Sequence, residues 1–252
     1  MAGTPDAASP ARLAARSRRT SGGAVAVTTR DVLLAGLTFS SGAADAIAFL
    51  GLGKVFTAFQ TGNLVFLGLG IAGADGPRAV RPAVSLACFA AGVLLGTRIV
   101  GGVRRAGSVW PARLSACLGM GLLAEVAFAI VWAVTSGHPG AASTDALLAM
   151  SALAMGLQSA AMLSLGVTGV FTTAATATVM FLMRDAAEPR TARAGEPSRF
   201  AAVLVALVAG ATAGGLMLLH ARTLAPLLPA AATAAVIAVA AARTSRPGST
   251  MP

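Results

Sequence analysis

The sequence predicts an all-α, polytopic membrane protein, and three observations support that fold class. Hydrophobic residues make up 56% of the 252 residues and charged residues only 11%, whereas soluble domains carry about 25% charged residues. Several apolar windows reach the roughly 20 residues that a helix needs to cross a bilayer. These windows are continuous rather than alternating, which disfavours a membrane β-barrel. We therefore expect an integral membrane helix bundle with six to eight membrane segments.

Polar or Gly/Pro-rich breaks divide the apolar part of the chain into eight segments. Their expected bounds are Val32–Leu52, Val55–Ala74, Ala79–Val100, Ala112–Val134, Ala146–Val167, Gly169–Met183, Phe200–His220 and Leu224–Ala242. Residues 1–30 are rich in Ala, Ser, Thr, Pro and Arg, which predicts a disordered cytoplasmic tail, and residues 243–252 form a short C-terminal tail. The first apolar segment is too long for the core of a signal peptide, so we expect it to be retained.

An internal repeat divides the membrane part into two halves, residues 31–134 and 145–242. Val55–Leu67 aligns with Val170–Leu182, and six of the thirteen positions are identical. The same order of features continues downstream, where Arg81 aligns with Arg199 and Gly92-x-x-x-Gly96 with Gly210-x-x-x-Gly214. Many transporters are built from paired repeats, with the substrate path between them. The glycine pairs predict close helix packing, either within one bundle or in a homodimer.

The distribution of Lys and Arg gives two topologies, both with a cytoplasmic N-terminus. If all eight segments cross, thirteen of these residues lie inside and six outside. If the second and sixth segments are re-entrant, the numbers become fifteen and four. The positive-inside rule favours the second topology, whereas the length of Val55–Ala74 favours a crossing, so both stay open.

Asp45 is a carboxylate in the middle of the first apolar segment, on one helix face with Thr38 and Ser41. Glu125 is a second acid deep in the fourth segment. Ionisable groups at that depth are costly and usually mark a functional site. Each acid is therefore either a proton-binding or cation-binding group or a structural residue bonded to a neighbouring helix.

The second apolar segment contains Gln60, Thr61, Gly62 and Asn63 in succession. Such a cluster either breaks the helix to line a site or lies in an intact helix and bonds to its neighbours. The second half carries Gln158 and a stripe of threonines at positions 168, 172 and 176. Our candidate substrate or proton site comprises Asp45, Gln60, Thr61, Gly62, Asn63, Glu125, Gln158, Thr172 and Thr176.

Other functional classes have little support in the sequence. The net charge of +10 comes from arginines in tails and loops without interleaved aromatic residues, so we expect no nucleic-acid partner. Cys88 and Cys117 are isolated, and no phosphate-binding loop, HExxH, CxxC or nucleophile elbow is present. We expect no catalytic residues, no metal and no cofactor, and hence no enzyme.

Two blocks of the sequence resemble a known family. Gly42-Ala43-Ala44-Asp45-Ala46, together with Thr61-Gly62-Asn63-Leu64, and Met155-Gly156-Leu157-Gln158-Ser159-Ala160 resemble the YoaK-like bacterial inner-membrane proteins, a family of unknown function. The resemblance implies a multi-pass protein of the bacterial plasma membrane and importance for the motif residues. It departs at Ala177, where the family has glycine.

Two functions follow as hypotheses. The first is a small secondary transporter or permease that binds a small solute or ion, including a proton, at a polar site within the bilayer. The second is a non-transporting membrane scaffold or stress-related factor, in which the polar residues only hold helices together.

Overall fold

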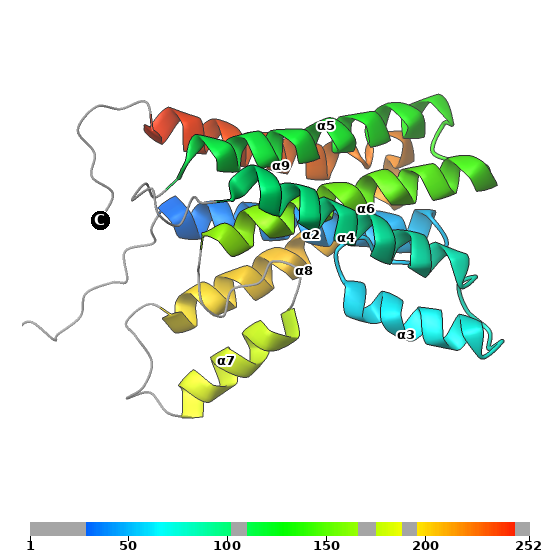
Figure 1. Cartoon of the computed structure of the whole chain (residues 1–252), viewed down its shortest axis with the longest axis horizontal. Coiled ribbons are helices and arrows are strands. Elements are labelled where there is room, and N and C mark those ends of the chain that lie inside the picture. The colour runs from blue at the N-terminus through cyan, green and yellow to red at the C-terminus, as the bar shows by residue number, and fades with distance from the viewer. Residues whose placement is uncertain (1–28, 102–109, 166–174, 188–195, 245–252) are drawn as a thin grey trace, which may run out of the picture.

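The structure is a computed structural model that describes residues 29–101, 110–165, 175–187 and 196–244 (Figure 1). Within these residues all the regular structure is helical, which confirms the all-α prediction. The α-helices are α2 (Thr29–Gly51), α3 (Gln60–Ile71), α4 (Val80–Val100), α5 (Ala112–Val134), α6 (Ala141–Ser164), α7 (Ala175–Ala187), α8 (Glu196–His220) and α9 (Leu227–Thr244), and a short 3-10 helix, η2, spans Arg222–Leu224.

Six of the helices, α2, α4, α5, α6, α8 and α9, are long and apolar enough to cross a membrane. The helices α3 and α7 have only 12 and 13 residues, about 18 to 20 Å at 1.5 Å per residue, which is too short to cross the hydrocarbon core. The expectation that Val55–Ala74 is long enough to cross was wrong, because α3 begins only at Gln60. The described structure is therefore a six-span bundle with two half-length helices.

Several sequence predictions fall partly or wholly outside the described residues. The N-terminal tail was expected to reach residue 30, but α2 already begins at Thr29. Residues 1–28, most of the C-terminal tail, and Thr168 and Thr172 of the threonine stripe are not among the described residues.

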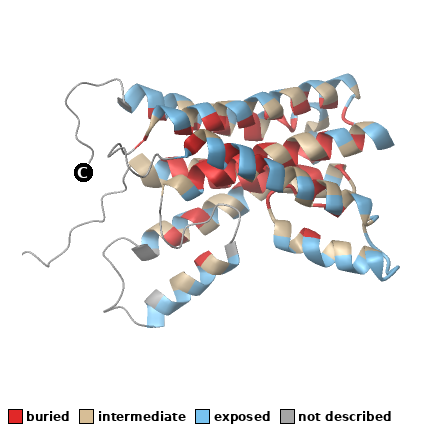
Figure 2. Cartoon of the chain, in the orientation of Figure 1, coloured by how far each residue is buried: buried red, intermediate tan, exposed pale blue. Residues whose placement is uncertain are grey.

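The helices α2 and α6 form the centre of the bundle (Figure 2). In their most apolar windows 61% and 72% of the residues are buried, compared with 22% in both α4 and α8. The helix α2 packs mainly on α8 and α9, whereas α6 packs mainly on α4 and α5. Each central helix from one half therefore packs against a flanking helix from the other half.

Glycines allow close backbone contact at both of these crossings, as the sequence predicted. A Cβ atom on Gly42 of α2 would clash with the Leu207 carbonyl of α8, and one on Gly210 would clash with the Phe39 carbonyl. In the other pair, a Cβ on Gly156 of α6 would clash with the Phe89 carbonyl of α4. The glycine pairs thus pack helices within a single chain.

An ion pair lies at one end of each crossing. Asp31 of α2 pairs with Arg199 of α8, and Arg81 of α4 pairs with Asp145 of α6 at 3.5 Å. Each of these four residues precedes the crossing glycine of its own helix by eleven residues, about 16 Å along a helix axis. Because α2 and α8 start at one end of the bundle and α4 and α6 at the other (Figure 1), the two ion pairs lie at opposite ends.

The half-length helices α3 and α7 follow the same arrangement. Both begin near the middle of the bundle and run toward opposite ends (Figure 1). The helix α3 packs on α4, and α7 packs on α8. Their N-terminal ends therefore lie at mid-depth, as in the broken helices of many transporters.

Candidate functional site

The chain leaves α2 through a tight turn and then returns to mid-depth. Gly53 adopts a positive φ of 96°, and the Lys54 amide donates a hydrogen bond of 3.1 Å to the Phe49 carbonyl. This is the geometry of a helix that ends on glycine. Residues 52–59 are not helical, so this segment must find hydrogen-bond partners for its backbone inside the bundle.

The carboxylate of Asp45 supplies the partner for three of these backbone amides. Its Oδ1 accepts hydrogen bonds from the backbone amides of Thr57 and Ala58, both at 2.7 Å, and from the Thr57 hydroxyl at 3.3 Å. Its Oδ2 accepts one bond, from the Phe59 amide at 3.0 Å. Since these amides lead directly into α3, Asp45 of α2 acts as the N-terminal cap of another helix.

A second cluster of polar side chains holds the same segment from the other side. The amide group of Asn63 accepts from the Phe56 amide at 3.0 Å and donates to the Phe56 carbonyl at 2.7 Å. It also donates to Gln60 Oε1 and to Ser85 Oγ of α4. Gln60 donates to the Thr57 carbonyl at 2.7 Å. These side chains replace the backbone bonds that the non-helical segment lacks.

The proposed helix break is therefore real but lies earlier than the polar cluster. Gln60, Thr61, Gly62 and Asn63 form the first turn of α3, and the break covers residues 52–59. The sequence left open whether this cluster breaks the helix or lies in an intact helix and bonds to its neighbours, and the first alternative relied on the flexibility of glycine. In the structure Gly62 instead provides room, since a Cβ there would lie about 3 Å from the rings of Phe56 and Phe59.

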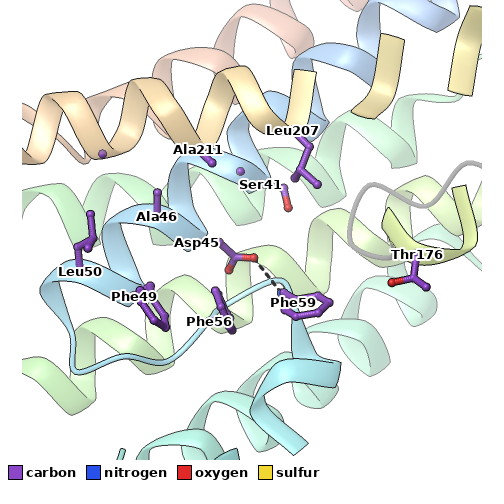
Figure 3. Close-up of a pocket in the computed structure, with 12 residues that line it drawn as sticks. Ser41, Asp45, Ala46, Phe49, Leu50, Phe56, Phe59, Thr176, Leu207 and Ala211 are labelled. Atoms are coloured by element: carbon purple, nitrogen blue, oxygen red, sulfur yellow. Dashed lines mark hydrogen bonds between the residues drawn. The ribbon is translucent and has the colours of Figure 1, made fainter. Parts of the chain in front are cut away.

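A cavity of about 590 Å³ opens beside Asp45, between α2, the segment 52–59 and α8 (Figure 3). Three phenyl rings belong to its wall, with Phe56 at 5.0 Å from Phe49 and 5.2 Å from Phe59 between ring centroids. The lining residues are Ser41, Gly42, Asp45, Ala46, Phe49, Leu50, Phe56, Phe59, Thr176, Leu207, Ala211 and Gly215. Asp45 is half-buried, so its carboxylate both caps α3 and faces the cavity.

Of the candidate site residues that the structure describes, the cavity wall includes two, Asp45 and Thr176, and Thr172 lies outside the described residues. Asn63 is buried and Gln60 half-buried, and their bonds are to the segment 52–59 and Ser85, behind the cavity wall. Thr61 is exposed on α3. We expected side-chain amides from both halves of the chain to meet in one pocket. The structure does not show this, because Gln60 and Asn63 are hydrogen-bonded to the backbone of the segment 52–59.

Gln158 and Glu125 lie elsewhere in the bundle. Gln158 donates to the Leu37 carbonyl of α2 at 3.0 Å and so links the two central helices. Glu125 of α5 is only 6% exposed and accepts a hydrogen bond from Thr233 of α9 at 3.2 Å. Its other oxygen has no partner in the described structure. Glu125 also lines a separate cavity of about 20 Å³ together with Ser151, a volume that suits one water molecule.

Sequence reasoning left five residues of the site out of the candidate set, namely Ser41, Ser85 and the phenylalanines at positions 49, 56 and 59. Ser85 donates to the Phe56 carbonyl at 2.7 Å, yet a lone serine in an apolar helix carries no signal. The three phenylalanines of the wall look like ordinary membrane residues. Ser41 was noted only for sharing a face with Asp45. Among the described residues no group of three His, Cys, Asp or Glu side chains could hold a metal ion.

Comparison with known proteins places these residues in a family. The family model described as "Protein of unknown function (DUF1275)" matches residues 33–240. The UPF0700 transmembrane protein YoaK of Bacillus subtilis (strain 168) is 31% identical over 156 residues, which cover 62% of this chain and 67% of that protein. No solved structure matches the chain. The resemblance drawn from the two motif blocks is confirmed, and the chain is a transmembrane protein that belongs to the DUF1275 family of unknown function.

Proposed function

We propose that this protein is a small permease that moves a solute through the cavity beside Asp45. The observation that carries the proposal is the cavity itself. It has a volume of about 590 Å³, lies at the start of a half-length helix, and is walled by α2 and α8, which come from different halves of the chain. A site at mid-depth between two halves is the common arrangement in secondary transporters.

The paired contacts described above support an ancestral duplication, which is part of the proposal. The helices α2, α4 and α5 would correspond to α6, α8 and α9. Under that correspondence Gly42 is equivalent to Gly156. The contact of Gly42 with Leu207 is then equivalent to the contact of Gly156 with Phe89. The half-length helices α3 and α7 would be equivalents with opposite orientation, as in an inverted repeat.

The two ion pairs fit the role of gates in such a permease. Asp31–Arg199 and Arg81–Asp145 would be equivalents at opposite ends of the bundle. Partly exposed pairs of this kind contribute only about 0 to 1 kcal/mol, so they can open and close at low energetic cost. In this proposal opening one pair while the other stays closed exposes the cavity to one side at a time.

The proposed location is the bacterial plasma membrane, with both termini in the cytoplasm. With six spans and with α3 and α7 on opposite sides, fifteen Lys and Arg residues fall on the side of the N-terminus and four on the other. The positive-inside rule then assigns the N-terminal side to the cytoplasm. The partners in this proposal are the bilayer and a small solute or ion, and a homodimer remains a hypothesis. The function is transport rather than catalysis.

One observation favours the alternative, a membrane scaffold without transport. In the described structure the side-chain hydrogen bonds of Asp45, Gln60 and Asn63 are made to the protein's own segment 52–59, to Ser85 or to each other. In that role the polar residues would only stabilise a non-helical segment inside the bundle, and the cavity would be a packing defect.

Solute flux in proteoliposomes with a filled cavity separates the two. Ala211→Phe places a ring in the cavity without altering Asp45 or its bonds. Ala209→Phe is the matched control, because Ala209 lies on the same helix and is exposed on the bundle surface. We expect Ala211→Phe to reduce flux at least tenfold and Ala209→Phe to leave it unchanged. Equal flux through both variants would reject the permease.

A further inference from the structure

The lining of the cavity has an unusual chemical balance. Among the described residues twelve line the cavity; of these only Asp45 is ionisable, and none is a lysine, arginine or histidine. One side presents the phenyl rings of Phe49, Phe56 and Phe59, and the other presents Leu207 and aliphatic groups (Figure 3). Any ligand of this cavity therefore meets an apolar, aromatic surface with a single carboxylate.

The charge of that carboxylate is only partly offset by the protein. The carboxylate lies beside the N-terminal end of α3, where the helix dipole offsets part of its negative charge, and no cationic side chain among the described lining residues offsets the rest. The two oxygens are also used unequally, since Oδ1 accepts three hydrogen bonds and Oδ2 only one, from the Phe59 amide. Oδ2 thus keeps capacity for a further donor or cation.

A second polar atom at the same cavity has no partner. Ser41 is 1% exposed, and its hydroxyl oxygen makes no hydrogen bond in the described structure. It lines the cavity one helical turn before Asp45, on the same face of α2 (Figure 3). A buried hydroxyl without a partner is costly, and a small movement of α2 or of the Ser41 side chain would be needed for a ligand in the cavity to bond it.

We infer that the cavity binds an organic monocation, with an ammonium-like head near Asp45 and Ser41 and an apolar or aromatic body against the phenylalanines. The inference rests on the proposed function and names its substrate class. Aromatic faces and a carboxylate together select cations with apolar bodies. A bare metal cation fits poorly, because it needs about six oxygen ligands and, within the part of the wall that the structure describes, side-chain oxygens come from only Ser41, Asp45 and Thr176. The volume matches sites for small organic ligands.

The test measures equilibrium binding to the full chain in lipid nanodiscs. The probes are benzyltrimethylammonium, its uncharged carbon analogue neopentylbenzene, and the anion phenylmethanesulfonate. We expect the cation to bind at least tenfold more tightly than either of the others. Gly215→Leu, whose added Cβ would have only Leu50 within 4 Å, at 3.9 Å, and Ala211→Phe should weaken cation binding at least tenfold, whereas Ala209→Phe should not.

Phe59→Leu removes one aromatic face. It should weaken binding of the cation severalfold more than binding of the uncharged analogue. Asp45 is left unchanged in these variants, because its loss would also release α3. Three results would overturn the inference: the cation does not bind, all three probes bind with equal affinity, or Gly215→Leu and Ala211→Phe leave cation binding unchanged.

Flux of the two charged probes in proteoliposomes separates this failure from failure of the proposed function. If Ala211→Phe blocks flux of the anion while the cation does not bind, the permease stands and the substrate class is wrong. If the cation binds in the cavity but neither charged probe crosses, the substrate class stands as a ligand class and transport is wrong.

Discussion

The two deep acids, Asp45 and Glu125, look alike in the sequence and have opposite surroundings in the structure. Asp45 is half-buried, accepts four hydrogen bonds and borders a cavity of about 590 Å³. Glu125 is almost fully buried, accepts a bond from Thr233, has one oxygen without a partner, and borders a cavity of about 20 Å³. Asp45 is hydrogen-bonded to three backbone amides of the segment 52–59. Glu125 is bonded to the Thr233 side chain, so a substitution there would not remove a backbone hydrogen bond.

The difference shows what an acid inside a membrane bundle can do. Asp45 stabilises a segment that has left helical geometry, and this segment in turn forms a wall of the cavity. Structure and proposed function therefore depend on one side chain there. Glu125 has the isolation expected of a proton-accepting group, but the large cavity does not reach it.

The largest effect should come from Asp45→Ala. The substitution leaves three backbone amides of the segment 52–59 without an acceptor, and each buried unsatisfied group costs about 1 to 3 kcal/mol. We expect a loss of about 3 kcal/mol or more, or failure to fold, seen as a large drop in thermal unfolding temperature in detergent. Asp45→Asn keeps an acceptor oxygen and should lose less. If Asp45→Ala unfolded at the same temperature as the unaltered protein, Asp45 would not be needed to hold the backbone before α3.

A smaller effect should follow from Asn63→Ala. It removes the bonds to the Phe56 backbone and to Ser85, and we expect a loss of about 2 kcal/mol in the same unfolding experiment. Thr61→Ala, at an exposed position on the same helical turn, is the control and should change stability by less than about 0.5 kcal/mol. Equal effects of the two substitutions would argue against the network.

The smallest effect should come from Glu125→Gln. The amide oxygen can still accept from Thr233, and the new amide group can donate into the small cavity beside Ser151. We expect stability within about 1 kcal/mol of the unaltered protein. If this change destabilises as much as Asp45→Ala, the two acids have the same structural role and the contrast between them is wrong.

Much of the fold could be predicted because membrane helices depend on local sequence. Apolar length and Gly/Pro breaks placed the six spans within a few residues, and the glycine spacing predicted close helix packing without predicting which helices cross. The start of α3 was misplaced because its cap, Asp45, lies on a different helix, and no spacing rule links it to Thr57 and Ala58.

The site was predicted less completely for the same reason. Asp45 stood out because a carboxylate in an apolar segment is costly. Which polar groups face a cavity depends on contacts between distant segments. Nothing in the sequence indicates that the Asn63 side chain is hydrogen-bonded to the backbone of Phe56. The ion pairs illustrate this point, since Arg81 and Arg199 were matched in the repeat but their partners, Asp31 and Asp145, were not.

The central claim, a water-accessible and negatively charged cavity beside Asp45, is tested most directly by thiol labelling. Cys88 and Cys117 are replaced by alanine, and a single cysteine is introduced as Ala211→Cys or, as the control, Ala209→Cys in nanodiscs. The account predicts that the cysteine at position 211 reacts with a cationic methanethiosulfonate faster than with an anionic one, and much faster than the cysteine at position 209. Equal, slow labelling at both positions would contradict it.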